Sequence, residues 1–224
     1  MKLPKPVHNV IFDLDGVLLD TEPLYTQATA AVATRFGKRY DWTVKSQCIG
    51  RGTLEAARII VDALALPLSP EQLVRERDVV LIGLLATAPA LPGAAALTRA
   101  LAAGGVPMAI ATSTEARLYA LKAAAHREWL AIFGAVVCGD DPRVRRAKPA
   151  PDIFLAAAAD LGAEPGDCLV FEDSPFGVEA ALAAGMQVVA LPDPAMDRTR
   201  YRDAHLVVGG FADLTLAALG LQQQ

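Results

Sequence analysis

Two short apolar runs that end in acidic residues constrain this chain most. Near the N-terminus Val10-Ile11-Phe12 leads into Asp13-Leu14-Asp15-Gly16, and far downstream Cys168-Leu169-Val170-Phe171 leads into Glu172-Asp173-Ser174. Such apolar runs are typical of strands buried on both faces of a parallel sheet. Ligand sites of these sheets lie beyond the carboxyl ends of the strands. Because clustered carboxylates repel unless a hard cation lies among them, the pattern predicts a magnesium site with a carboxylate free to attack.

Over most of the chain, short strand-like runs alternate with longer Ala/Leu-rich helical patterns. This rhythm predicts an α/β fold, a doubly wound (Rossmann-like) parallel sheet. Strands are expected at 7–13, 106–112, 135–138, 168–172, 187–191 and 205–208, and helices at 92–103, 115–125, 151–161 and 175–184.

The segment between the first and second expected strands breaks this rhythm. It contains only helical patterns, at 23–36, 53–64 and 70–86, flanked by short proline-bearing connections. An all-helical insert of this length predicts a small cap domain at 20–90, with the core formed by 1–19 and 91–224.

Composition excludes several classes of function. Hydrophobic residues make up 53% of the 224 residues, which suits a substantial core, and the net charge is −4. No long Lys/Arg run is present, so nucleic acid is not an expected partner. No run of about 18 apolar residues suggests a membrane span, and the first residues do not resemble a signal peptide. Three scattered cysteines without a CxxC spacing favour a reduced, cytoplasmic protein.

Further polar residues end or follow the other expected strands. Thr112 and Ser113 precede a helix, where free backbone N–H groups suit a phosphoryl oxygen. Lys148 stands before a proline-rich helix start. Each feature alone has an ordinary alternative: Asp13 and Asp15 could cap a turn, Ser113 or Thr114 could be an N-cap, and a single lysine is usually exposed.

In this order and spacing the four segments resemble the haloacid dehalogenase-like hydrolase superfamily. The matching motifs are Asp13-Leu14-Asp15-Gly16-Val17, Thr112-Ser113, Lys148-Pro149 and Glu172-Asp173-Ser174. The resemblance covers essentially the whole chain, and it implies a helical cap between the first and second motifs. It also implies a phosphatase rather than a dehalogenase, because dehalogenases of this superfamily lack an acid at the position of Asp15.

The resemblance implies a role for each motif residue. Asp13 is expected to attack phosphorus and form an aspartyl-phosphate, and Asp15 to act as acid and then base. Thr112, Ser113 and neighbouring backbone N–H groups are expected to hold phosphoryl oxygens. Lys148 is expected to pair with Asp13 and the phosphoryl group, which limits charge repulsion. Mg2+ is the expected cofactor, with ligands from Asp13, the backbone carbonyl of Asp15, Asp173 and Glu172, the last directly or through water.

A narrower resemblance, to pseudouridine-5'-phosphatases and related sugar-phosphate phosphatases, lies outside these motifs. It is carried by 18–25, 40–46, 54–60, 139–142 and 178–189. The expected partner is a small phosphomonoester, a sugar or nucleotide phosphate with pseudouridine 5'-phosphate favoured, and the chain is expected to be a monomer. In the cap, Gly50 and Arg51 are candidate substrate-binding residues. The cluster Arg143, Arg145 and Arg146 is expected to lie in a solvated loop, and whether it also contacts the leaving group is left open.

Two alternative functions remain at this stage. Mutases of the β-phosphoglucomutase type carry a histidine and a lysine where this chain has Tyr25 and Glu115, so the resemblance to them is weaker. A catalytically idle binding protein is the other alternative, and the joint presence of Asp13, Asp15, Lys148 and Asp173 argues against it.

Overall fold

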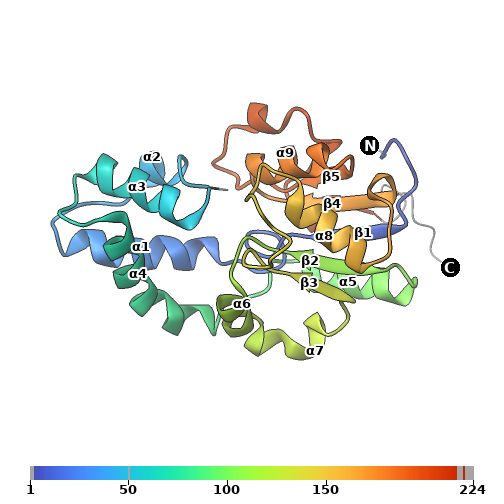
Figure 1. Ribbon diagram of the computed structural model, residues 1–224, viewed down its shortest axis with the longest axis horizontal. Coiled ribbons are helices and arrows are strands. Elements are labelled where there is room, and N and C mark those ends of the chain that lie inside the picture. The colour runs from blue at the N-terminus through green and yellow to red at the C-terminus, as the bar shows by residue number, and fades with distance from the viewer. Residues whose placement is uncertain (1–2, 50, 216–218, 220–224) are drawn as a thin grey trace.

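Parallel strands form a single sheet, which lies among helices in one half of the protein (Figure 1). The computed structural model describes residues 3–49, 51–215 and 219. Within them the strands are β1 (Asn9–Phe12), β2 (Met108–Ala111), β3 (Ala135–Val137), β4 (Cys168–Glu172), β5 (Gln187–Ala190) and β6 (Leu206–Val207). Their order in the sheet is β3-β2-β1-β4-β5-β6, and every pairing is parallel. The chain therefore winds outward from β1 in both directions, which confirms the doubly wound α/β prediction.

Helices cover both faces of this sheet. Phe12 of β1 and Phe171 of β4 belong to one buried cluster, which includes side chains from α5 (Ala94–Ala103) and α7 (Arg127–Leu130). Ile11 and Val170 point to the other face, into a cluster with α8 (Asp152–Asp160) and α9 (Pro175–Ala183). Because successive strand residues face opposite sides, continuous apolar runs are what a sheet covered on both faces needs.

The segment between β1 and β2 is helical and lies to one side of the sheet (Figure 1). It consists of α1 (Glu22–Thr34), α2 (Trp42–Lys45), α3 (Thr53–Leu64) and α4 (Pro70–Leu85). Val32, Ile60 and Leu73 come from three of these helices and share one small core. Ala28 and Leu81 belong to a second cluster, against which Leu118 of the core helix α6 (Ala116–Ala123) packs.

The predicted elements are present, with shifted ends. β1, β2, β3, β5 and β6 are each shorter than expected, whereas β4 and α3 have the expected bounds. The helices α2 and α7, and 3-10 turns at Ala124–His126, Pro165–Asp167, Arg198–Tyr201 and Phe211–Asp213, were not expected. These are segments of one or two turns, too short to show a helical period. Among the described residues, no helix is both long and apolar enough to cross a membrane.

Candidate active site

The parallel register brings the acidic residues of the two opening motifs together. Phe12 pairs with Ile110 of β2 on one side and with Phe171 of β4 on the other. The backbone N–H of Asp13 continues this ladder by donating to the carbonyl of Phe171 at 3.0 Å. Asp13 therefore leaves β1 beside Glu172, the last residue of β4.

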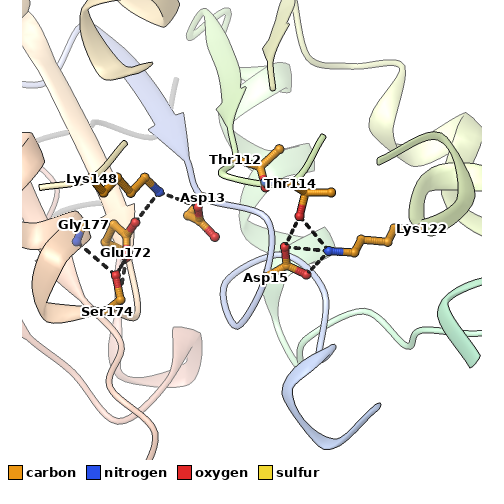
Figure 2. A network of polar contacts seen from close by, with 9 residues as sticks. All are labelled: Asp13, Asp15, Thr112, Thr114, Lys122, Lys148, Glu172, Ser174 and Gly177. Atoms are coloured by element: carbon orange, nitrogen blue, oxygen red, sulfur yellow. Dashed lines mark hydrogen bonds and ion pairs between the residues drawn. The ribbon is translucent and has the colours of Figure 1, made fainter. Parts of the chain in front are cut away.

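A buried lysine lies between two of these carboxylates. Lys148 Nζ donates to Asp13 Oδ1 at 2.6 Å and to Glu172 Oε1 at 2.5 Å (Figure 2). The exposed fractions are 6% for Asp13, 1% for Glu172 and 9% for Lys148, so all three charges are largely withdrawn from water. Such burial is tolerated only when each charge has close partners. A single ammonium facing two carboxylates leaves an excess of negative charge.

A third carboxylate increases that excess and completes a set of oxygen donors. Asp13, Glu172 and Asp173 each offer an oxygen, and the three oxygens lie within 4.8 Å of one another. Burial, opposed by the charge of Lys148, raises the pKa of Asp13 to about 7. Burial and the charges of Glu172 and Asp13 raise the pKa of Asp173 well above its usual value. Three carboxylates this close together repel one another when no cation is bound. Their oxygens are the ligands that a hard divalent cation such as Mg2+ prefers, so the cluster fits such an ion.

Glu172 is fixed by the start of α9. Its Oε2 accepts hydrogen bonds from the backbone N–H of Ser174 at 2.8 Å and from Ser174 Oγ at 3.0 Å. Ser174 is also the N-cap of α9, because its Oγ accepts from the N–H of Gly177 at 3.0 Å. The helix start thus sets the position of the carboxylate, and it packs so closely that only glycine fits at position 177. A Cβ there would lie 1.9 Å from Glu172 Cδ.

We expect Gly177→Ala to displace Glu172 and to lower the free energy of unfolding by about 1–3 kcal/mol, the usual cost of overpacking. Because Glu172 belongs to the oxygen cluster, the variant is also expected to need more Mg2+ for any metal-dependent stabilisation. Urea denaturation at several Mg2+ concentrations measures both effects. Gly166→Ala is the matched control, since no atom lies within 4 Å of its added Cβ. Equal stability of the two variants would contradict the expectation.

Asp15 faces a different set of partners from Asp13 (Figure 2). Lys122 Nζ donates to both of its carboxylate oxygens, at 2.6 and 2.7 Å. Thr114 Oγ1 donates to Oδ2 at 2.7 Å, and Thr21 Oγ1 donates to Oδ1. Burial alone would raise the pKa of Asp15, but the charge of Lys122 and these hydrogen bonds outweigh it, so its pKa lies below the usual value.

The second motif lies at the end of β2, next to these carboxylates. Thr112 is fully buried, and its Oγ1 accepts from the N–H of Thr114 at 3.1 Å. Ser113 is exposed. Both line a small cleft together with Asp13, Asp15 and Lys148. Glu22, Glu172 and Asp173 line the same cleft.

A larger cavity of about 590 Å³ opens between this edge of the sheet and the helical segment. From the core it is lined by Asp15, Ser113 and Thr114, and from the helical segment by side chains that include Tyr25 and Lys45. Asp15 lines both the small cleft and the large cavity. It is therefore at the junction between the carboxylate cluster and the space enclosed by the helices.

Arg51 reaches the site but has partners within the protein. It lines both cavities, its guanidinium pairs with Glu55, and it lies over the ring of Phe176 at 5.1 Å. Its Nε donates to the carbonyl of Gln47 at 2.8 Å. Gly50, the other candidate of this segment, lies outside the described residues.

The basic cluster before Lys148 is largely satisfied by its own surroundings. Arg143 pairs with Asp141 and Asp160, and Arg146 pairs with Asp152. These pairs favour the interpretation of this cluster as a solvated loop.

Sequence reasoning missed several residues of the site. Lys122, Thr114 and Thr21 hold Asp15, and Gly177 packs against Glu172. For Lys122 a weak signal existed: it lies four residues after Leu118, which packs against the helical segment, so it is a lysine on an apolar helix face. No spacing in the sequence connects it with Asp15.

Comparison with known proteins agrees with this geometry. A family model of haloacid dehalogenase-like hydrolases matches residues 7–185. A probable pseudouridine-5'-phosphatase of Drosophila melanogaster is 44% identical over 223 residues, covering 98% of this chain and 96% of the relative. (DL)-glycerol-3-phosphatase 2 of Arabidopsis thaliana is 43% identical, covering 96% and 92%. The crystal structure of a HAD family hydrolase from Deinococcus radiodurans, with bound phosphate and sodium, has a TM-score of 0.78 at 29% identity, covering 95% of each chain.

The chain belongs to the haloacid dehalogenase-like hydrolase family. Within that family it is an enzyme of the phosphatase type, because relatives that match nearly its whole length at 43–44% identity are phosphatases.

Proposed function

We propose that this protein is a Mg2+-dependent phosphatase that hydrolyses a small phosphomonoester through an aspartyl-phosphate, with a core of 1–19 and 91–224 and a cap of 20–90. The observation that carries the proposal is the position of Asp13. It is buried at the end of β1, bonded to Lys148, and clustered with Glu172 and Asp173 in a cleft next to a cavity of about 590 Å³.

In the first step an Asp13 oxygen attacks phosphorus, and the bond from phosphorus to the ester oxygen breaks. Asp15 gives a proton to the leaving oxygen. In the free protein the effect of burial is outweighed by Lys122 and the hydrogen bonds, which keep the pKa of Asp15 low, but the negative phosphoryl group raises that pKa in the complex, because a nearby like charge disfavours ionisation. In the second step Asp15 takes a proton from a water molecule that attacks the same phosphorus, which releases phosphate and restores Asp13. The place of Asp15 at the junction of cleft and cavity supports these roles, because the ester oxygen joins the phosphoryl group to the organic part.

The remaining motif residues bind or compensate the negative charge of the substrate and the carboxylates. Lys148 pairs with Asp13 and limits repulsion between the carboxylate and an anionic substrate. Thr112 and Ser113, with backbone N–H groups before α6, hold phosphoryl oxygens. Mg2+ would be held by Asp13, the carbonyl of Asp15, Asp173 and Glu172. When bound, it supplies charge stabilisation and orientation of the phosphoryl group.

The substrate we favour is a phosphorylated sugar or nucleoside, with pseudouridine 5'-phosphate as the leading candidate. The cavity volume suits a ligand of this size. Its lining combines the tyrosines Tyr25 and Tyr40 with an ion pair between Lys45 and Glu22, groups that suit stacking and hydroxyl recognition. The relative with 44% identity supports the particular candidate, and the glycerol phosphatase relative keeps smaller substrates open.

A mutase needs an acid or base at position 25, and Tyr25 argues against one. Burial and the charge of Asp15 raise the pKa of its hydroxyl, and the ring faces the ammonium of Lys122 at 5.1 Å. This tyrosine is therefore a poor substitute for histidine near neutral pH.

Phosphate release, with Mg2+ and with EDTA, tests the proposal on pseudouridine 5'-phosphate, uridine 5'-phosphate, FMN, glycerol 3-phosphate and hexose phosphates. We expect Mg2+-dependent release with a preference for pseudouridine 5'-phosphate. Uniform weak release would reject that substrate and keep the phosphatase. Absence of release from every compound would reject the phosphatase.

Mg2+ is also expected to stabilise the folded protein, because the oxygen cluster exists only in the native state. At a free concentration a hundred times its dissociation constant, the gain is about 2.7 kcal/mol. Thermal melts in EDTA and in Mg2+ measure the resulting rise in Tm. Asp173→Asn should lose most of the rise, whereas Asp203→Asn, an exposed aspartate, should keep it. An equal rise in both variants would show that Mg2+ binds elsewhere.

A further inference from the structure

Lys122 is a fully buried lysine that none of the steps above uses. It lies on α6, two turns after Thr114. An ammonium withdrawn from water is costly unless its partners compensate for the lost hydration. The partners of Lys122 therefore indicate why a lysine is present there.

All three protons of this ammonium are directed at the acid/base region. Lys122 Nζ donates to Asp15 Oδ1 at 2.6 Å, to Asp15 Oδ2 at 2.7 Å and to Thr114 Oγ1 at 2.7 Å. Thr114 Oγ1 in turn donates to Asp15 Oδ2. The hydroxyl of Tyr25 also hydrogen-bonds with Lys122. Because an ammonium has three donors, these partners use its full capacity and none is left for substrate.

The same ammonium contacts the cap. Lys122 Nζ lies over the ring of Tyr25 of α1 at 5.1 Å, and the guanidinium of Arg77 of α4 lies over that ring at 5.4 Å. A cation near an aromatic face is attracted to it. Asp15 is therefore connected through Lys122 to both α6 of the core and two helices of the cap.

We propose that Lys122 is a positioning residue for Asp15: without touching the substrate, it fixes the carboxylate at the junction of cleft and cavity, and the ring of Tyr25 ties that position to the cap. This inference rests on the proposed function, because it assigns Lys122 to the acid/base step of that reaction. Loss of the ammonium leaves the Asp15 carboxylate, among the described residues, with the hydrogen bonds of Thr21 and Thr114, so the carboxylate turns away from the ester oxygen.

The test compares two substrates that differ in their need for an acid. Glycerol 3-phosphate releases an alkoxide oxygen that must be protonated, whereas p-nitrophenyl phosphate releases a phenolate that leaves without a proton. In Lys122→Met, kcat/KM for glycerol 3-phosphate should fall about 30-fold. For p-nitrophenyl phosphate it should change less than about threefold, while the phosphoenzyme, trapped by acid quench, accumulates because the second step also needs Asp15.

Lys122→Arg, which keeps the positive charge, should recover most of the loss in kcat/KM for glycerol 3-phosphate. An equal fall in kcat/KM for both substrates would overturn the proposal, because it would mean general damage to the site. The absence of any fall would overturn it as well. Thr98→Ala is the control for stability alone: it removes a buried hydrogen bond to Trp129 far from the site and should leave both values unchanged.

A double-mutant cycle with Asp15→Asn tests whether Lys122 acts through Asp15, and it also removes the uncompensated charge if Lys122→Met folds poorly. In the Asp15→Asn background, Lys122→Met should change phosphoenzyme formation from glycerol 3-phosphate by less than about twofold, against about 30-fold when Asp15 is present. A further loss of more than about fivefold overturns the proposal.

Failure of the proposed function has a separate signature, namely a wild-type protein that releases phosphate from neither substrate. In that case crystal structures of the wild type and Lys122→Met decide the inference. An Asp15 carboxylate that keeps its position without Lys122 overturns it, and a carboxylate that has turned away supports it.

Discussion

Asp13→Asn should abolish turnover and at the same time stabilise the metal-free protein. The amide has nearly the shape of the carboxylate but is not a nucleophile, so we expect kcat to fall at least about a thousandfold. In EDTA the same change should raise Tm near pH 8, because burial raises the pKa of Asp13 to about 7 and the ionised form is therefore disfavoured in the fold. Activity and stability change in opposite directions.

The pH dependence of this stabilisation follows from the sign of the shift. The pKa of Asp13 is higher in the folded protein than its ordinary value of 3.8. Folded Asp13 thus retains a proton that the unfolded chain has lost, and wild-type stability falls as pH rises from about 4 to about 7. Thermal melts in EDTA should show the gap in Tm between Asp13→Asn and wild type widening over this range and then levelling.

Asp203→Asn is the matched control, since it makes the same chemical change at an exposed position. It should leave kcat unchanged and show no widening gap in Tm. If Asp13→Asn retained more than about a tenth of wild-type turnover, the covalent mechanism would be rejected.

Lys148→Met should be the most destabilising single change among the site residues. Lys148 Nζ lies 2.6 Å from Asp13 Oδ1 and 2.5 Å from Glu172 Oε1, and all three side chains are buried. Removing one partner of a buried ion pair leaves charge without compensation, which typically costs about 3–5 kcal/mol. We expect a loss of this size in EDTA and at least about a hundredfold fall in kcat, because the anionic substrate then meets uncompensated carboxylates.

Two further measurements isolate the electrostatic cause. In the Asp13→Asn background, Lys148→Met should cost less stability, since one of the two carboxylates is then neutral. Lys38→Met removes an exposed lysine and should cost almost nothing. If Lys148→Met cost equally much in both backgrounds, packing rather than charge would explain the loss.

The relation between sequence and site is clearest for residues that follow strands. Asp13, Thr112 and Glu172 could be placed together from the sequence, because parallel strands bring their carboxyl ends to one edge of a sheet. The βα units are equally local in origin, since each consists of an apolar run and the helix after it. The order of the strands in the sheet was not predicted and comes from the structure. The helical insert was recognisable because no strand pattern interrupts it between β1 and β2.

Lys122 and Gly177 could not be placed in the same way. The contact between Lys122 and Asp15 joins residues 107 positions apart, and it depends on how far α6 is rotated about its axis where Leu118 packs against α1 and α4. Gly177 is required because the first turn of α9 lies close against the side chain of Glu172. The packing of α9 on the sheet sets the separation between them.

By itself, then, the sequence determined the sheet, the insertion of the helices and the chemical types gathered at one edge, because the period of apolar residues and the ends of strands are local properties. Which carboxylate pairs with which lysine depends instead on the fold of the whole chain. Lys148 could be assigned to Asp13 by resemblance alone, and Lys122 to Asp15 not at all. Such pairs require side chains from separate elements to be positioned to within a few tenths of an ångström, and the packing of the whole molecule sets those positions.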